Sequence, residues 1–166
     1  MITPAMMRFI NKDEELAFIL AHELSHNIMG HPQSLRQNAL GGAILGALAD
    51  ALAGRGGVNT HGDFTRAGAE IGVLAYSADF EREADYVGMY ILARSGYRPD
   101  DVPNFWRRLS VKQPKAIFVG VTHPTNPERY VTMQKAIAEV RYKQAHRQAL
   151  LPERMAEAQI APAAGR

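Results

Sequence analysis

The sequence of 166 residues contains no cysteine. This absence excludes disulfide bonds, catalysis by a thiol and thiolate metal sites. Any metal that the chain binds must be held by nitrogen and oxygen atoms, which means by histidine, aspartate or glutamate. A chain without cysteine also suits an oxidising compartment.

An excess of charge of one sign and long apolar runs are also missing. The 19 basic and 17 acidic residues give a net charge of +2. Because no dense basic stripe accompanies this balance, we expect no nucleic-acid partner. No segment is long enough to span a bilayer, and residues 1–10 lack the cationic start and apolar core of a secretory signal. The length fits a single domain.

The chain does contain an HExxH motif at residues 22–26. Residues four apart on a helix share one face, so His22 and His26 can bind the same zinc ion. Glu23 lies beside them, where it can take a proton from a water molecule. The motif therefore predicts a zinc-dependent peptidase. The alternative is a surface helix with two solvated histidines.

The motif lies in a predicted helix that covers residues 12–29. Asn11 has the character of an N-cap, and Glu14 completes a capping-box pattern. Gly30 is predicted to end the helix at its C-terminus. Apolar residues surround the motif from Leu16 to Ile28, which predicts a buried helix whose histidines need partners.

A catalytic zinc site needs a third protein ligand, with water in the fourth position. His31 is one candidate, because HExxH with a nearby glycine and histidine is similar to the metzincin pattern HExxHxxGxxH. That pattern places glycine three and histidine six residues after the second histidine. Here Gly30 comes four residues and His31 five residues after His26, so the spacing fails. We expect His31 at the end of the helix, where a cation suits the helix dipole.

The other candidate lies on a second predicted helix, over residues 65–94. Glu81 and Asp85 are four apart and share a face, and Gly88 on that face would let another helix approach closely. Glu83 points roughly 160° away from Glu81, so only one of the two can face the zinc. On this basis Glu81 is the expected ligand. Without the HExxH motif, the segment would be typical of a solvated helix face.

Three motifs in order carry a resemblance to a known family: HELSH at 22–26, EREAD at 81–85 and THP at 122–124. Together they resemble the zinc metallopeptidases of the CAAX prenyl protease and HtpX-like family. The resemblance covers residues 7–130. It implies a gluzincin with a zincin-like, mainly helical catalytic core.

The resemblance also implies a role for each matching residue. One zinc ion per chain would be held by His22, His26 and Glu81. Glu23 would be the general base, and Asp85 would support a ligand histidine. His31 fits as well, because members often carry a histidine five residues after the second ligand.

His123 and Arg129 are the remaining candidates for the active site. Peptide hydrolysis builds negative charge on the carbonyl oxygen, and a donor placed at that oxygen lowers the barrier. The resemblance puts a histidine of the third motif, and an arginine six residues later, near the active centre. In some members such a histidine contacts the metal and keeps the enzyme latent. The alternative for His123 is loop packing.

The resemblance also bears on the ends of the chain. Members carry more sequence before the HExxH helix, including a strand whose edge binds extended substrate. We therefore expect that the N-terminal part of the peptidase domain is missing. We place the catalytic domain at residues 1–150 and a flexible tail at 151–166. The expected substrate is a polypeptide and the expected location is the bacterial cell envelope, in the periplasm or at the membrane. The sequence leaves the oligomeric state open.

The segment 39–57 is rich in glycine and alanine. Gly42 and Gly46 give a spacing of small residues that permits close helix packing. One interpretation is a helix packed on the core. The other is a mobile apolar flap or a hairpin that touches the membrane surface beside the cleft.

The sequence as a whole predicts a mainly α, zincin-like domain with at most a small amount of strand. The predicted function is that of a zinc metalloendopeptidase. One rival is a zinc-binding, chaperone-like module with little proteolysis, and another is a helical interaction domain without metal. Two histidines and a carboxylate also form the facial triad of iron oxygenases, but the HExxH helix spacing argues against that site.

Overall fold

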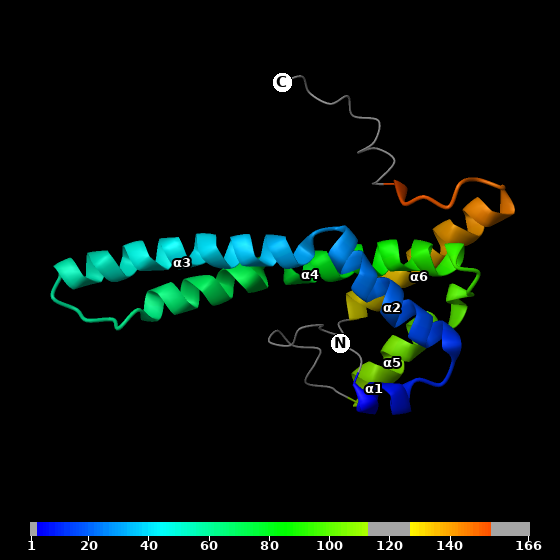
Figure 1. The fold of residues 1–166 in the computed structure, drawn as a ribbon, viewed down its shortest axis with the longest axis horizontal. Helices are drawn as coiled ribbons and strands as arrows, with labels where there is room; N and C mark the ends of the chain where they lie inside the picture. Colours follow the sequence, from blue (N-terminus) through cyan, green and yellow to red (C-terminus); the bar gives the residue numbers. More distant parts are fainter. Residues whose placement is uncertain (1–2, 113–126, 154–166) are drawn as a thin grey trace, which may run out of the picture.

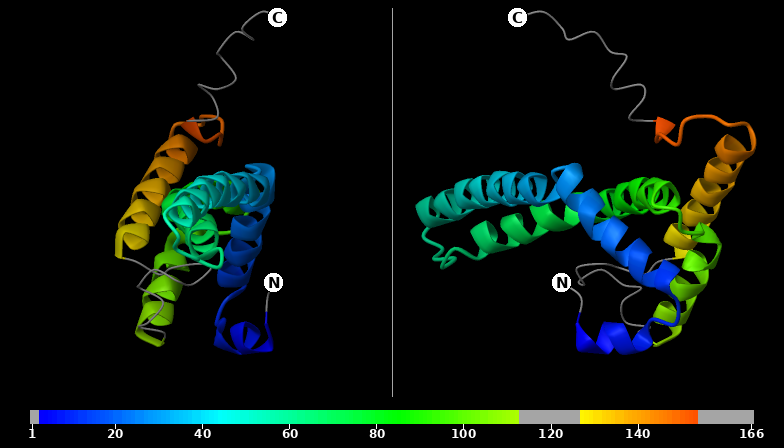
Figure 2. Two further views of the ribbon diagram at one scale, coloured as in Figure 1. Left: turned by 90° about the vertical axis from the view of Figure 1, so that its left-hand side faces the viewer. Right: turned by 45° about the vertical axis from the view of Figure 1, so that its right-hand side comes forward.

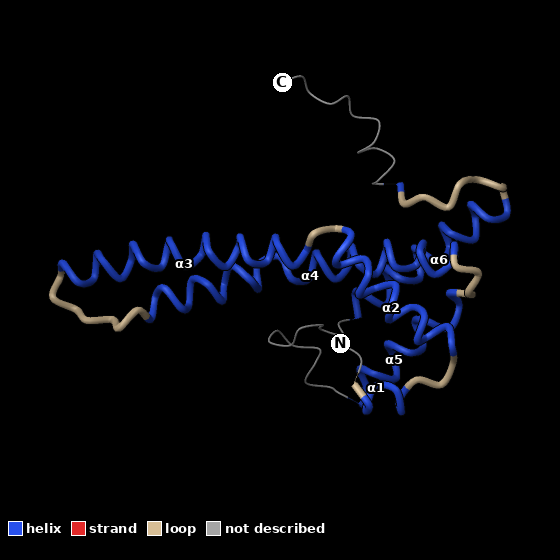
Figure 3. The backbone as a smooth tube through the Cα atoms, viewed as in Figure 1, coloured by secondary structure: helices blue, strands red, loops and turns tan. Residues whose placement is uncertain are grey.

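The computed structural model describes residues 3–112 and 127–153 (Figure 1). Its elements are α1 (Pro4–Phe9), α2 (Asp13–Ile28), α3 (His31–Arg55), α4 (Asp63–Arg94), the 3-10 helix η1 (Pro99–Asp101), α5 (Val102–Lys112) and α6 (Pro127–Ala145). The described residues contain no strand, as Figure 3 shows, and the predicted mainly helical class is confirmed. His123 and most of the predicted tail lie outside the described residues.

The cap of α2 differs from the prediction by one residue. Lys12, not Asn11, is the N-cap, and its side chain makes no capping hydrogen bond. The Glu15 carboxylate, rather than that of Glu14, accepts a hydrogen bond from the backbone N–H of Asn11, at 2.9 Å. Glu15 is buried and also accepts two hydrogen bonds from Arg108 of α5, at 2.9 and 2.8 Å. The shift therefore reflects a tertiary contact that local sequence does not reveal.

α2 is buried along one face only, so the prediction of a buried helix holds for that face and not for the opposite one. Phe18, His22 and Ser25 lie on the buried face. Leu20 and Leu24 of the same helix are about half exposed, at 53% and 49%. The buried face is the one that carries both histidines of the motif toward α4.

The core of the molecule is formed by α2, the C-terminal half of α4, α5 and α6, a unit called here the helical body. Its buried apolar residues include Phe18, Met89, Leu92, Val102, Phe105, Leu109, Met133 and Ile137. A Cβ atom on Gly88 of α4 would lie 3.2 Å from the backbone nitrogen of His22. Glycine thus permits the predicted close approach of the two helices, and this approach brings the HExxH motif against α4.

α3 and the N-terminal half of α4 form an antiparallel hairpin that extends away from the helical body (Figures 1 and 2). Its helices meet through glycine: a Cβ atom on Gly42 would overlap the carbonyl of Gly68, and one on Gly46 that of Phe64. The interpretation of segment 39–57 as a helix packed on the core is therefore wrong. The segment packs on α4, since glycine lets the two backbones touch.

Asp50 fixes the far end of the hairpin. Its carboxylate accepts hydrogen bonds from the Thr60 hydroxyl, from both the N–H and hydroxyl of Thr65, at 2.9 and 2.6 Å, and from the Phe64 N–H, at 3.3 Å. These bonds satisfy the first amides of α4. Of the helices that the structure describes, none has the length and apolar character needed to cross a membrane.

Candidate metal centre

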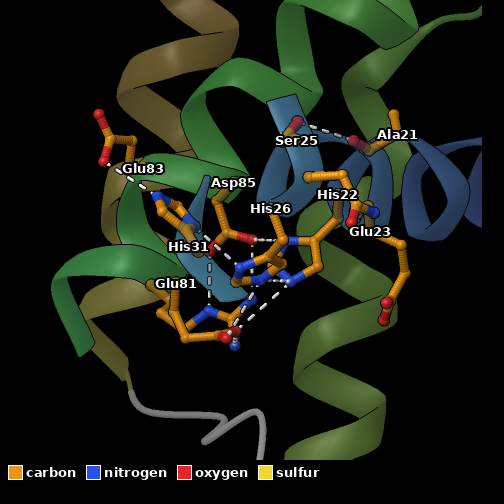
Figure 4. A network of polar contacts seen from close by, with 11 residues as sticks. Ala21, His22, Glu23, Ser25, His26, His31, Glu81, Glu83 and Asp85 are labelled. Atoms are coloured by element: carbon orange, nitrogen blue, oxygen red, sulfur yellow. Dashed lines mark hydrogen bonds and ion pairs between the residues drawn. The ribbon is translucent and has the colours of Figure 1, made fainter. Parts of the chain in front are cut away.

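Three side chains predicted as metal ligands converge at the contact between α2 and α4 (Figure 4). The two Nε2 atoms of His22 and His26 are 3.1 Å apart. Glu81 approaches from α4, with Oε2 at 3.4 Å from His22 Nε2 and Oε1 at 3.3 Å from His26 Nε2. His22 and Glu81 are buried, and His26 is partly buried.

The spacing of these atoms fits a small tetrahedral cation. Zinc is bound by histidine nitrogen and carboxylate oxygen at about 2.0–2.2 Å, so two ligand atoms of one tetrahedron are about 3.3 Å apart. The three separations of 3.1, 3.4 and 3.3 Å agree with that value. Two imidazoles and one carboxylate also form a donor set of the kind found in catalytic zinc sites. Residues 22, 26 and 81 could therefore hold such an ion.

Asp85 and Arg129 lie behind these donors. Asp85 Oδ1 is 2.9 Å from His22 Nδ1, the nitrogen that faces away from Glu81. Arg129 of α6 donates through Nε and Nη2 to the two oxygens of Asp85, both at 2.7 Å. Its Nη1 is 2.8 Å from Glu81 Oε2, and its guanidinium lies 4.2 Å from the ring centre of Trp106. Arg129 therefore links the carboxylates of Glu81 and Asp85 on α4 to α6.

The sequence did not reveal these ion pairs of Arg129. It placed Arg129 near the active centre as a donor to the reacting carbonyl, whereas here each of the nitrogens Nε, Nη1 and Nη2 contacts a carboxylate. Asp85 and Arg129 are 44 residues apart, so no local pattern links them. The arrangement favours a positioning role for Arg129.

Basic and acidic side chains meet in this buried cluster. Burial opposes the charged form of His22, but hydrogen bonds to Asp85 and Glu81 outweigh it and raise the pKa of His22 to about 9. Burial likewise opposes the charge of Arg129, yet Asp85 and Glu81 raise the pKa of its guanidinium. Two cations thus face two carboxylates. A metal that binds His22 must displace its proton.

His31 lies at the start of α3, whereas the sequence predicted it at the end of α2. Gly30 adopts a left-handed φ of 72° and turns the chain, so that His31 is the first residue of α3 rather than the last of α2. The dipole of α3 disfavours a cation there. Burial lowers the pKa of His31; the hydrogen bond to Glu83 opposes this effect, and the neighbouring His26 adds to the lowering. The prediction that His31 is a cation at a helix C-terminus is wrong.

Glu23 follows His22 on α2 and is partly buried. Figure 4 shows its side chain on the opposite side of the two motif histidines from Glu83. Its role as a base and the role of His123 remain predictions. Sequence reasoning missed one further contact at this site, between Glu83 and His31, whose Oε2 and Nε2 atoms are 3.2 Å apart.

Comparison with known proteins gives a family match over most of the chain. Residues 1–137 match the family described as Peptidase family M48. The chain is 31% identical over 140 residues to the beta-barrel assembly-enhancing protease of Yersinia pestis, covering 75% of this chain and 28% of that protein. It is 29% identical over 153 residues to the same-named protein of Escherichia coli O157:H7, covering 82% and 30%.

A eukaryotic relative also matches. The mitochondrial metalloendopeptidase OMA1 of Saccharomyces cerevisiae is 27% identical over 132 residues, covering 74% of this chain and 36% of that protein. The family match and these relatives support the predicted zinc metallopeptidase family as a whole. The relatives are named as beta-barrel assembly-enhancing proteases and OMA1, not as CAAX prenyl proteases or HtpX. The chain spans about three tenths of the length of the two bacterial relatives. No solved structure matches it.

Proposed function

This chain belongs to peptidase family M48, and from that premise we propose that it is a zinc-dependent metalloendopeptidase with one zinc site, formed by His22, His26 and Glu81. One observation carries the proposal. Donor atoms from two helices, separated by more than fifty residues of sequence, lie 3.1–3.4 Å apart in a buried cluster. Members of this family generally use zinc.

The proposed mechanism assigns each residue one task. A zinc ion, when bound, lowers the pKa of water to about 7 and polarises a carbonyl. Glu23 accepts the proton of the water whose oxygen adds to the scissile carbonyl carbon, and returns it to the leaving amine as the C–N bond breaks. Asp85 holds the His22 ring through Nδ1, 2.9 Å away. Arg129 keeps Glu81 and Asp85 in place, and His123 donates to the developing oxyanion.

The proposed substrate is a polypeptide, and the proposed setting is quality control in the bacterial cell envelope. The names of the bacterial relatives, which refer to β-barrel assembly, support this setting. We place the catalytic domain at residues 1–150. Contact with a membrane surface is proposed through the outer face of α3, whose exposed apolar residues include Leu40, Ile44, Leu45, Leu48 and Leu52.

Zinc content and hydrolysis of unfolded casein, measured side by side, test the proposal. Glu81→Gln removes a ligand and should lose both. Glu23→Gln should keep about one zinc per chain and lower hydrolysis by about 10²–10⁴-fold, because only the proton transfer is lost. Glu70→Gln is the matched control, since Glu70 is an exposed glutamate of α4, the helix that carries Glu81. It should keep both properties.

Two outcomes would contradict the proposal. Full hydrolysis by Glu23→Gln would remove the general base from the mechanism. Wild-type protein without zinc would remove the metal site. Bound zinc without any hydrolysis, together with suppression of casein aggregation, would instead favour the chaperone-like alternative.

A further inference from the structure

Two of the three acidic residues of the EREAD segment belong to the buried cluster at the metal centre, and the third contacts His31. Glu81 faces the two motif histidines, and Asp85 contacts His22 Nδ1 at 2.9 Å. Glu83 projects from the other side of α4, as the helical spacing predicts, yet it does not simply face solvent. Its Oε2 lies 3.2 Å from Nε2 of His31, a residue that is only 2% exposed. Neither the metal site nor the mechanism above uses this contact.

A second contact continues the path to the metal centre. His31 Nδ1 is 2.9 Å from His26 Nδ1, and His26 Nε2 is the atom that faces Glu81 and His22. The sequence of contacts is therefore Glu83 to His31, and His31 to the back of His26 (Figure 4). It approaches the second ligand as Asp85 approaches the first.

The positions of the protons along this series of contacts follow from the chemistry of imidazole. A neutral imidazole that binds a metal through Nε2 carries its proton on Nδ1. The acceptor nearest to His26 Nδ1 along this path is His31 Nδ1, which must then be unprotonated. The remaining proton of His31 resides on Nε2 and points at the Glu83 carboxylate. One set of tautomers thus satisfies both contacts.

The surrounding structure holds His31 in this position. Gly30, with its φ of 72°, turns the chain immediately before His31. The His31 ring is stacked on Phe80, with a centroid separation of 4.5 Å and an interplanar angle of 20°. Such packing restricts the ring rotations that would break either hydrogen bond.

We propose that Glu83 and His31 are positioning residues that together fix the tautomer and ring orientation of His26. The inference rests on the metal site proposed above, and it assigns the two histidine ligands separate supports. His22 is oriented directly by Asp85, and His26 is oriented by Glu83 through His31. Residues that orient metal-bound histidines in this way typically contribute about 10–100-fold to metal affinity.

The zinc dissociation constant of the 166-residue chain, measured by competition with a chelator, tests this directly. Glu83 is partly exposed, with 34% of its side chain accessible, so Glu83→Ala should leave the fold intact. We expect this variant to bind zinc about 10–100-fold more weakly than wild type. Glu83→Gln should recover most of the affinity, because its amide oxygen still accepts from His31 Nε2–H. Glu70→Ala is the control and should bind as wild type does.

A spectroscopic measurement separates positioning from a general structural role. Nitrogen-15 NMR of the zinc-loaded protein should show His26 protonated on Nδ1 and His31 protonated on Nε2, with the His31 tautomer lost or mixed in Glu83→Ala. His31 protonated on Nδ1 in wild type would overturn the inference. So would a zinc affinity of Glu83→Ala equal to that of Glu70→Ala, and in that case the proposed function would stand. Wild-type protein without zinc would overturn both.

Discussion

α4 passes through two regions that are held together in different ways. In the helical body, large apolar side chains are buried, and Met89 and Leu92 are 0% and 1% exposed. In the hairpin, backbones meet at Gly42 and Gly68, while Leu45 and Ile71 face outward at 69% and 66% exposure. Apolar residues thus pack the first region and cover the surface of the second.

This difference explains why the metal centre lies where it does. Ion pairs among Glu81, Asp85 and Arg129 are stronger where water is excluded, and of these two regions the helical body is the one that buries them. The polar groups of the hairpin are more exposed, and its main network, around Asp50, serves to begin a helix. Stability of the site should therefore depend on the body and be largely independent of the hairpin.

The largest expected effect comes from Arg129→Ala in the metal-free protein. The change leaves Glu81 and Asp85 without their shared cation in a buried setting, which typically costs about 3–5 kcal/mol. Arg141→Ala is the control on the same helix, because Arg141 is 63% exposed and forms a surface pair with Asp100. Denaturant unfolding measures both. Equal losses in the two variants would mean that the buried cluster does not support the fold.

A matched pair of leucines compares the two regions directly. Leu92→Ala in the helical body should lower the free energy of unfolding by about 2–5 kcal/mol, because it leaves a cavity. Leu45→Ala in the hairpin should change it by less than about 0.5 kcal/mol, since that side chain is 69% exposed. A large loss from Leu45→Ala would show that the outer face of α3 is covered in solution.

A pair of neighbouring glycines examines the hairpin itself. A methyl group on Gly42 meets the Gly68 carbonyl, whereas one on Gly41 meets no atom within 4 Å. Gly42→Ala should therefore destabilise the hairpin by about 1–3 kcal/mol through overpacking. Gly41→Ala should stabilise the helix by about 0.5–1 kcal/mol. Hydrogen exchange of the α3 amides reports both changes, and the same sign for the two would contradict the close packing.

The smallest effect concerns pH. Hydrogen bonds from Thr60 and Thr65 lower the pKa of Asp50 from 3.8 to about 2. A carboxyl group with a lowered pKa stabilises the folded state above its unfolded pKa, and that contribution is lost as the pH falls through the folded value. Amide protection at residues 63–66 should therefore decline between pH 4 and pH 2. In Asp50→Asn this decline should be absent; an identical decline there would exclude Asp50 as its cause.

The sequence predicted most of the local structure and part of the site. The predicted helix over 65–94 agrees with α4, and the four-residue spacings correctly placed His22 with His26 and Glu81 with Asp85 on shared faces. These features depend on helical periodicity alone. Periodicity also predicted that Glu83 would point away from Glu81, and the structure agrees.

What the sequence did not reveal depends on contacts between distant segments. The position of His31 follows from the turn at Gly30, and its partner Glu83 is 52 residues away. The N-cap of α2 shifted because Glu15 pairs with Arg108, which is 93 residues away. The partner of the glycine-rich helix was also left open by the sequence, because glycine spacing permits close packing without indicating which helix will be the partner.

The central claim is that one zinc ion is bound between α2 and α4. A crystal structure of the zinc-loaded chain, with an anomalous difference map at the zinc edge, tests it most directly. The account predicts a single strong peak about 2.0–2.2 Å from the Nε2 atoms of His22 and His26 and from a Glu81 carboxylate oxygen. A peak at His31 and Glu83 instead, or no peak beside His22, would contradict it.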